Sequence, residues 1–254
     1  MKHVSFSQLK DWHFCPFYHK LVRIDGLKGF RGNTFTAFGN AIHDTCENML
    51  TEGLDRPYDF FLERFGKVLN ELRSDGIEID DGLVEKMEEQ ARPLVELVLP
   101  ELEEYFGEYE VVSAEELLYE DIDDSELKYK GYIDLVLRTP DGKTHVIDWK
   151  SCSWGWDARK KSDPMVTYQL TFYKYFYARK HGLDPKDVET HFALLKRTAK
   201  QNNVEFFRVT SGQIKTNNAL NFLNKAIYNI QKDKHIKNRL SCSKCDFYKT
   251  EHCP

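Results

Sequence analysis

The sequence predicts an α/β protein in which a mixed central sheet is flanked by helices. Apolar residues recur at helical spacing up to about residue 107, the period changes to the alternation of strands from Glu110, and helical and strand segments alternate after residue 152. A chain of 254 residues can bury a substantial core as one large domain. We therefore expect one α/β core decorated by helices.

Two helices are expected before residue 51. Ser5 and Gln8 have capping-box spacing, and apolar residues follow in one helical segment at Leu9, Trp12, Phe14 and Phe17. The second helix is expected over about residues 38–50, with its apolar side formed by Phe38, Ile42 and Met49.

An acidic segment follows at residues 52–108. Helices are expected at about residues 57–75 and 81–107, and the helical period of the second is broken near Pro93 and Pro100, because proline removes a backbone donor. We expect this segment to form a helical subdomain that covers the core or moves over it.

The strand signals begin after this segment. Strands are expected at residues 111–122, 129–138 and 144–151. Asp163 and Pro164 provide an N-cap and a first-turn proline for a helix that runs to His181 and stops at Gly182. Strands at about residues 190–197 and 204–210, a helix at about residues 211–234 and a cysteine-rich tail complete the order.

The net charge of -5 conceals a segregation of charge along the chain. Residues 71–126 hold 21 acidic and 3 basic residues, whereas residues 196–249 hold 12 basic and 3 acidic residues. The basic region would attract phosphate, and the acidic region would repel it. The alternative is that two solvated helical faces of opposite sign pack together.

The sequence carries no address for export or for a membrane. No apolar run approaches the length of a bilayer span, and the N-terminus lacks the apolar stretch of a secretory signal. We therefore expect a cytoplasmic protein with no membrane partner. The six cysteines of such a protein are more often core residues, metal ligands or catalysts than disulfides.

Two aspartates are expected to meet in a β-hairpin. Residues 139–142, Thr-Pro-Asp-Gly, have the composition of a turn. If Asp141 is the centre of this turn, Asp134 and Asp148 face each other across the two strands, with their Cβ atoms about 4.5–5.5 Å apart. Adjacent carboxylates repel, so a hard divalent cation with oxygen ligands is expected between them. The alternative is a surface hairpin with a polar face, and a slip of one residue would separate the two aspartates.

A lysine and a helix complete this constellation. Lys150 lies two residues after Asp148, which returns its side chain to the same face of the strand. There its ammonium can orient a metal-bound water or stabilise charge on a phosphate oxygen. Gln169 and Tyr173 share one face of the following helix, from which they could contact phosphate or a base.

Three fragments in this order resemble a known family. Residues 131–134 read Gly-Tyr-Ile-Asp, residues 148–151 read Asp-Trp-Lys-Ser, and residues 169–173 read Gln-Leu-Thr-Phe-Tyr. Together they resemble the PD-(D/E)xK nucleases of the RecB type. Gly39 and His43 resemble the glycine and histidine that this branch carries on an upstream helix.

The resemblance implies a fold and a set of roles. It implies a restriction-endonuclease-like core in which Asp134 and Asp148 bind Mg²⁺ or Mn²⁺ and Lys150 assists the attacking water. The backbone oxygen of Trp149 and the side chain of His43 would complete the metal shell. Glu115 resembles an additional acidic position of the family, and its neighbour Glu116 is the alternative for that position.

The cysteine tail suggests a second metal centre. Cys242, Cys245 and Cys253 have the spacing C-x2-C-x7-C, and three thiolates so close in a cytoplasmic protein suggest a metal. Cys15, within Phe-Cys-Pro-Phe, resembles the early cysteine of iron-sulfur nucleases in this branch. These include the CRISPR-associated RecB-like exonucleases and the AddB nuclease domain, in which one early and three late cysteines hold a 4Fe-4S cluster. Structural zinc is the alternative, and Cys46 and Cys152 are expected to be ordinary thiols.

The loop after Lys150 interleaves aromatic and basic residues, as single-strand binding surfaces do. The residues concerned are Trp154, Trp156, Arg159, Lys160 and Lys161. The alternative is that the tryptophans pack on the core. The leading hypothesis is an exonuclease on single-stranded DNA ends. The alternatives are a double-strand endonuclease, or a nuclease-like protein that presents DNA to recombination or CRISPR-adaptation partners.

We thus expect one nuclease domain over residues 1–254. Within it, residues 1–51 would carry Cys15 and His43, and residues 52–108 would form the acidic subdomain. Residues 109–210 would form the catalytic core, and residues 211–254 would form the last helix and the cysteine tail.

Overall fold

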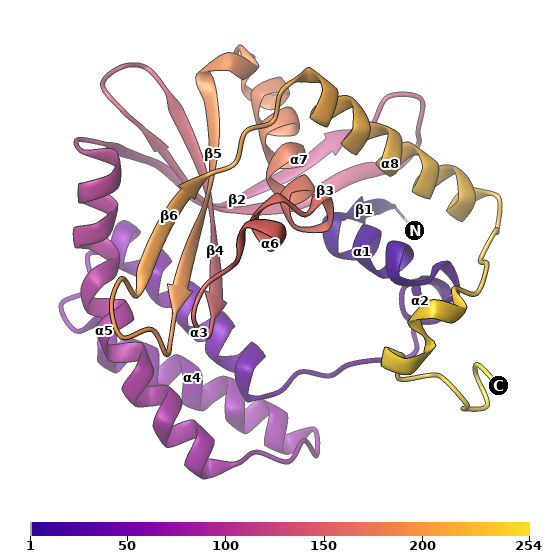
Figure 1. The fold of residues 1–254 in the computed structure, drawn as a ribbon, viewed down its shortest axis with the longest axis horizontal. Helices are drawn as coiled ribbons and strands as arrows, with labels where there is room; N and C mark the ends of the chain where they lie inside the picture. The colour runs from indigo at the N-terminus through magenta and orange to yellow at the C-terminus, as the bar shows by residue number, and fades with distance from the viewer. Residues whose placement is uncertain (1) are drawn as a thin grey trace.

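A six-stranded mixed sheet forms the centre of the computed structural model, which describes residues 2–254 (Figure 1). The strand order is β1-β3-β4-β5-β6, and β2 pairs with the other edge of β3. β1 pairs with β3 and β4 pairs with β5 in parallel, and the remaining pairs are antiparallel. The strands are β1 (His3–Ser5), β2 (Glu110–Asp121), β3 (Lys128–Arg138), β4 (Thr144–Cys152), β5 (Val188–Lys196) and β6 (Val204–Arg208).

Helices cover both faces of the sheet, with an apolar core between each face and its helices. One core joins the sheet to α3 (Thr34–Thr51), α4 (Pro57–Ser74) and α5 (Asp81–Phe106). The other joins it to α1 (Phe6–Phe14), α7 (Pro164–His181) and α8 (Gln213–Gln231). The shorter helical segments are α2 (Pro16–His19), α6 (Ala158–Ser162), a π turn at Lys20–Ile24 and 3-10 turns at Pro185–Asp187 and Arg239–Lys244. No helix within residues 2–254 is both long and apolar enough to cross a membrane.

Strand β3 is shared unequally between its neighbours. β2 pairs along the length of β3 on one edge. On the other edge, β1 pairs with residues 128–130 and β4 pairs with residues 135–138. Within the described part of the chain, residues 131–134 therefore have no ladder partner on that edge. The sheet splits at this point, and Asp134 lies at the split.

The predicted hairpin register is confirmed. The Cα partners are Leu135 and Ile147, Val136 and Val146, Leu137 and His145, and Arg138 and Thr144. The backbone N–H of Gly142 donates to the carbonyl of Thr139 at 2.9 Å, which closes the predicted turn. This register follows from local chemistry, since glycine at position 142 supplies the positive φ of 83° that the turn needs.

Two helix predictions were wrong in detail. The first helix ends at Phe14, and Pro16 begins α2, because a proline disfavours helical backbone in the residue before it. α5 continues through Pro93 and Pro100, where a break was predicted. Both prolines lie outside the buried stripe of this helix, which is formed by Val84, Met87, Ala91, Leu94, Val95, Val98 and Leu102. The packing of this stripe outweighs the two hydrogen bonds that the prolines remove.

The α7 prediction is confirmed at both ends. The Asp163 side chain accepts from the backbone N–H of Met165, Pro164 begins the helix, and Gly182 ends it in the left-handed conformation. β1 and α6 were not predicted, because segments of three and five residues are too short to show a period.

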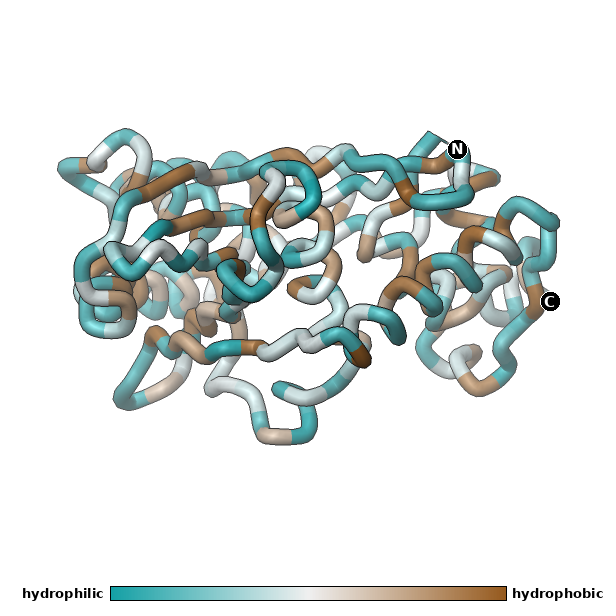
Figure 2. The backbone as a smooth tube through the Cα atoms, turned by 90° about the horizontal axis from the view of Figure 1, so that it is seen from above, coloured by the Kyte–Doolittle hydropathy of each residue, from teal (hydrophilic) through white to brown (hydrophobic). Residues whose placement is uncertain are grey.

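The two ends of the chain lie on the same side of the molecule in both views (Figures 1 and 2). The side-chain amide of Asn238 donates to the carbonyl of Phe14 at 2.8 Å, and its backbone N–H donates to Cys15 Sγ at 3.2 Å. The cysteine tail is thus held against the junction between α1 and α2.

Candidate active site

The split in the sheet brings Asp134 and Asp148 together. The hairpin ladder ends at Leu135 and Ile147, one step before the two aspartates. At this step Asp134 Oδ2 accepts a hydrogen bond from the backbone N–H of Trp149 at 2.7 Å. The Asp134 side chain therefore accepts from a backbone N–H of β4 that lies beyond the end of the ladder. This hydrogen bond holds the Asp134 carboxylate beside Asp148.

Asp148 is the most buried member of the group. It is 1% exposed, and the Lys150 ammonium forms an ion pair with its Oδ2. The amide of Gln169 donates to Asp148 Oδ1 at 2.8 Å and to the hydroxyl of Tyr173 at 3.0 Å. Of the two residues predicted on α7, Gln169 contacts Asp148 directly and orients its carboxylate, and Tyr173 contacts Gln169.

Burial sets the electrostatics of this centre. Burial, followed by repulsion from Asp148, raises the pKa of Asp134 well above its ordinary value. Burial likewise raises the pKa of Asp148, although Lys150 opposes this shift. Burial disfavours the charge on Lys150, but attraction to Asp148 and Asp134 outweighs it and raises the pKa of Lys150. One ammonium therefore faces two buried carboxylates, and a cation would stabilise the ionised form of both.

His43 reaches the same centre from α3. Its Nδ1 lies 3.7 Å from Asp134 Oδ2. Burial and the nearby Lys150 lower the pKa of His43 to about 3. The imidazole is therefore neutral near pH 7, which is the form that binds metals.

Two glycines let the helices approach the sheet. A Cβ atom on Gly39 of α3 would lie 3.3 Å from Ser151 Oγ at the end of β4. A Cβ atom on Gly131 of β3 would lie 2.9 Å from Cε1 of Tyr173, a distance at which the ring must move. Gly39 brings His43 towards β4, and Gly131 brings the Tyr173 ring against the split.

Glu115 and Glu116 are separated by the alternation of β2. Glu116 accepts from Ser113 at 2.5 Å and pairs with Lys180 and His181 at the end of α7. The pKa of Glu115 is raised by partial burial, then by the carboxylates of Glu47, Asp44 and Asp148. Glu115 is therefore the residue of the two that faces the carboxylate centre. Its φ of 48° shows that β2 is locally irregular at this position.

The donor set suits a hard divalent cation. Two carboxylates and one neutral imidazole lie around the split on β3, β4 and α3, although their ligand atoms are not all within 4.8 Å of one another, and a further carboxylate stands nearby on β2. Oxygen-rich sets of this kind bind Mg²⁺ or Mn²⁺. The residues present therefore fit the metal that the sequence pattern implied.

Residues 3–250 match the sequence family described as the PD-(D/E)XK nuclease superfamily. The chain belongs to this superfamily. Its members generally use divalent metals such as Mg²⁺ or Mn²⁺. The comparison with curated protein sequences gives no significant match.

A solved structure with a TM-score of 0.62 shares the fold of this nuclease. A structure described as a putative exonuclease from Eubacterium rectale is 16% identical, with a TM-score of 0.62, and the match covers 94% of this chain and 84% of that one. A structure of the protein SSO0001 is 11% identical, with a TM-score of 0.37, and covers 95% of this chain and 92% of that one.

A basic cavity of about 510 Å³ adjoins the carboxylate centre of the nuclease. Lys150, Gln169 and Tyr173 line it together with residues from β1, α1 and β3. Lys10, Arg23 and Lys130 bring positive charge to its wall. Sequence reasoning missed these three residues, because only the pairing of β1 with β3 brings the N-terminal segment to the strand that carries Asp134. The basic character of residues 20–31 was the one signal that pointed there.

The five residues proposed for the DNA-binding loop divide into two groups. Trp154 is 78% exposed, and Arg159 and Lys160 are also exposed. Trp156 packs edge-on against Phe192, with ring centroids 5.2 Å apart. Lys161 forms an ion pair with Glu205.

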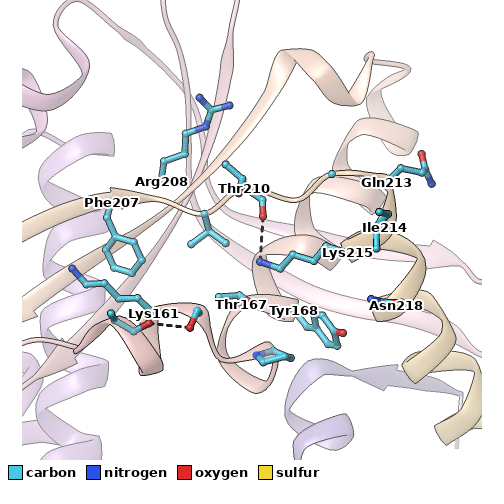
Figure 3. A pocket seen from close by; sticks show the side chains of 15 residues that line it. Lys161, Thr167, Tyr168, Phe207, Arg208, Thr210, Gln213, Ile214, Lys215 and Asn218 are labelled. Atoms are coloured by element: carbon cyan, nitrogen blue, oxygen red, sulfur yellow. Dashed lines mark hydrogen bonds between the residues drawn. The ribbon is translucent and has the colours of Figure 1, made fainter.

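A larger cavity, of about 1040 Å³, lies beyond this loop. It is formed by α6, α7, β6 and the start of α8, and Figure 3 shows Lys161 and Phe207 at one end and Gln213 and Asn218 at the other. Neither Asp134 nor Asp148 of the carboxylate centre lines it. The size of a cavity therefore does not identify the chemical centre of this nuclease.

Four of the cysteines gather near the chain ends. Cys15 and Cys253 are buried, and Cys242 and Cys245 are half-buried. Burial raises the pKa of Cys245, and Cys253 and Cys15 lie close enough to raise it further. Cys46 is buried within α3, and Cys152 ends β4, so both lie apart from this group.

Proposed function

We propose that this protein is a metal-dependent deoxyribonuclease that acts as an exonuclease on single-stranded DNA ends. The observation that supports the proposal best is the position of Asp134, Asp148 and Lys150 at the split in the sheet, beside a basic cavity. DNA processing during recombination, repair or CRISPR-type reactions would supply such ends.

The proposed roles follow from the contacts. Asp134, Asp148, His43 and the backbone oxygen of Trp149 would hold Mg²⁺ or Mn²⁺, and Glu115 would stand behind them. The bound metal would lower the pKa of a water and stabilise charge on the scissile phosphate. Lys150 would orient that water, with Asp148 holding its ammonium in place. Gln169 would keep Asp148 in a single orientation.

The cavity supports a single strand as the substrate. Lys10, Arg23 and Lys130 would contact phosphates leading away from the metal, and Trp154, Arg159 and Lys160 would contact the strand from the other side of Lys150. Salt should weaken this binding steeply, because phosphate contacts release counterions.

The experiment compares linear and circular single strands in Mn²⁺. An exonuclease shortens an end-labelled linear strand and leaves a circle of the same sequence intact. Nicking of the circle would reject exonuclease action, and preferential cutting of duplex DNA would favour the double-strand endonuclease. Binding of linear and circular strands without cleavage in Mg²⁺ or Mn²⁺ would favour a nuclease-like protein that presents DNA to partner proteins.

We also propose that Cys15, Cys242, Cys245 and Cys253 hold a 4Fe-4S cluster that joins the two ends of the chain. Within residues 2–254, no three cysteine thiols lie within 4.8 Å of one another. Tetrahedral zinc would bring thiolates to about 3.8 Å, and metal analysis distinguishes a zinc site from the cluster. The N–H of Asn238 on Cys15 Sγ is the type of donor that stabilises a ligating thiolate.

Metal analysis tests this second proposal. Protein purified without oxygen should be brown, with about four irons and four sulfides per chain. Cys15→Ala should lose the colour and become insoluble, whereas the matched control Cys152→Ala should keep both properties. One zinc without iron would replace the cluster by a zinc site. A soluble, fully active Cys15→Ala protein would reject the proposal that a cofactor bound by Cys15 joins the two ends of the chain.

A further inference from the structure

A second group of metal-binding side chains lies on the other face of the sheet. His145 of β4 is the Cα partner of Glu189 of β5, and His191 lies two residues further along β5. All three side chains therefore share one face. Asp148 lies three residues after His145 and belongs to the opposite face, so this group is separate from the carboxylate centre.

The ligand atoms of this group form a small triangle. His145 Nδ1 lies 3.1 Å from His191 Nε2, and Glu189 Oε2 lies 3.9 Å from each of these nitrogens. Zinc held tetrahedrally at 2.0–2.1 Å would place its ligand atoms about 3.3–3.4 Å apart. To reach this size, the nitrogen–nitrogen side must lengthen slightly and the two sides of 3.9 Å must each shorten by about half an ångström. Within residues 2–254 it is the one group of at least three such residues with ligand atoms this close together.

Each ligand is oriented by an outer partner. His145 Nε2 lies 3.0 Å from Thr139 Oγ1, and His191 Nδ1 lies 3.4 Å from the Tyr105 hydroxyl. Arg208 holds the second oxygen of Glu189 at 2.9 Å, which leaves Oε2 for the triangle. Outer hydrogen bonds of this kind fix the tautomer and the ring orientation of metal-binding histidines.

When both rings donate outwards, their inner nitrogens face each other as lone pairs. A cation between them would satisfy both, whereas a metal-free site must turn one ring proton inwards. Burial lowers the pKa of His145, and burial and His145 lower the pKa of His191 to about 3. Neutral imidazole is the form in which histidine binds metals.

A cavity of about 510 Å³ opens beside the triangle. Tyr105, Glu108, Asp141 and Arg208 line it together with the three ligands. The fourth position of a tetrahedral ion would face this space, whose wall carries the guanidinium of Arg208 and the carboxylates of Glu108 and Asp141.

We propose that His145, Glu189 and His191 bind one divalent transition-metal ion, zinc by the chemistry of the donor set, with its fourth position open to the adjacent cavity. Two imidazoles and one carboxylate are a borderline set that prefers Zn²⁺ to Mg²⁺. The site does not depend on the proposed nuclease activity, and it is distinct from the cysteine group.

The test measures zinc in the full-length protein after dialysis, with the cysteine group left as purified. Wild-type protein should bind one more zinc than His191→Gln and Glu189→Gln, and the matched control His181→Gln should equal the wild type. His181 is exposed and pairs with Glu116, so its loss leaves the triangle untouched. X-ray absorption of the additional zinc should show nitrogen and oxygen neighbours and no sulfur.

The variant Thr139→Val tests the outer hydrogen bond to His145, because it keeps all three proposed ligands. Loss of this outer partner should weaken zinc binding about 10–100-fold. Equal zinc content in wild type, His191→Gln and Glu189→Gln would overturn the proposal. Sulfur neighbours around the additional zinc would also overturn it, because they would assign the ion to the cysteines.

Discussion

Strand β4 carries two different chemistries on its two faces. Asp148 and Lys150 face α7 and form a charged centre in which burial raises the carboxylate pKa values. His145 faces the C-terminal end of α5 and joins a group whose imidazoles burial keeps neutral. On the first face, burial disfavours the ionised carboxylates, and a cation would stabilise them. On the second face, burial favours the neutral form of the imidazoles.

On the two proposals made above, the faces of one short strand would hold ions of different preference. Because successive side chains point to opposite faces, residues three positions apart on β4 cannot share an ion. Oxygen ligands with a lysine beside them suit a hard ion that activates water. Imidazoles with fixed outer partners suit a tightly held borderline ion.

The largest expected effect is a loss of DNA cleavage that is confined to substitutions on the first face. Lys150→Ala and Asp148→Asn should reduce cleavage at least about 100-fold, because they remove the proposed transition-state charge and metal ligand. Fluorescence anisotropy should show DNA binding within a few-fold of wild type. His191→Gln should cleave DNA at close to the wild-type rate. If His191→Gln loses as much cleavage activity as Lys150→Ala, the two faces of β4 act together in cleavage.

Gln169 tests how far the first centre depends on positioning. Gln169→Ala frees Asp148 Oδ1 and should lower kcat about 10-fold with a small change in Tm. Tyr173→Phe removes only the acceptor behind Gln169 and should have a weaker effect. A large fall in Tm with unchanged specific activity would make both residues part of the core.

The metal-free stability should depend on the charge of Asp134. Its raised pKa means that folding disfavours its ionised form, so the stability that protonation provides is present at low pH and is lost as the pH rises through the folded-state pKa. Asp134→Asn removes the charge but keeps an acceptor for the Trp149 N–H. In chelator near pH 7, it should raise the free energy of unfolding by on the order of 1 kcal/mol.

Urea unfolding at pH 7 and at pH 4 measures this effect. The gain should shrink at the lower pH, where the wild-type carboxyl is itself protonated. A variant less stable than wild type at pH 7 would show that the Asp134 charge stabilises the fold even without a metal.

The smallest effect distinguishes the two neighbouring glutamates. Glu115→Gln should reduce cleavage about threefold and raise the Mn²⁺ concentration needed, because it removes negative charge near the centre. Glu116→Gln is the matched control, since its partners are Lys180 and His181 on the far side. A metal titration of both variants checks the difference, and a stronger effect in Glu116→Gln would reverse the assignment.

The candidate site was predictable where its signals are local. The turn at residues 139–142 sets the hairpin register, and the alternation of a strand then places Asp148 and Lys150 on one face. Gly39 and Gly131 could be recognised only through the family resemblance, because the contacts that require them come from other elements.

Sequence reasoning missed features that depend on pairing over long distances. Lys10 reaches the centre through β1, a strand of three residues that pairs 125 positions away. His145 and His191 are 46 residues apart and meet because β4 and β5 are parallel, which no local period shows. The persistence of α5 through its prolines is likewise decided by the core against which it packs.

The hydrogen bond from the Trp149 N–H to Asp134 makes one amide proton a spectroscopic reporter. Its chemical shift depends on the charge of the carboxylate that accepts it, and a metal that withdraws electron density from this oxygen would weaken the bond. Nuclear magnetic resonance of a selectively tryptophan-labelled protein would therefore display the arrival of a metal, or of a proton, at the centre. The same peptide group joins β4 to the Asp134 side chain of β3 and records the state of that side chain.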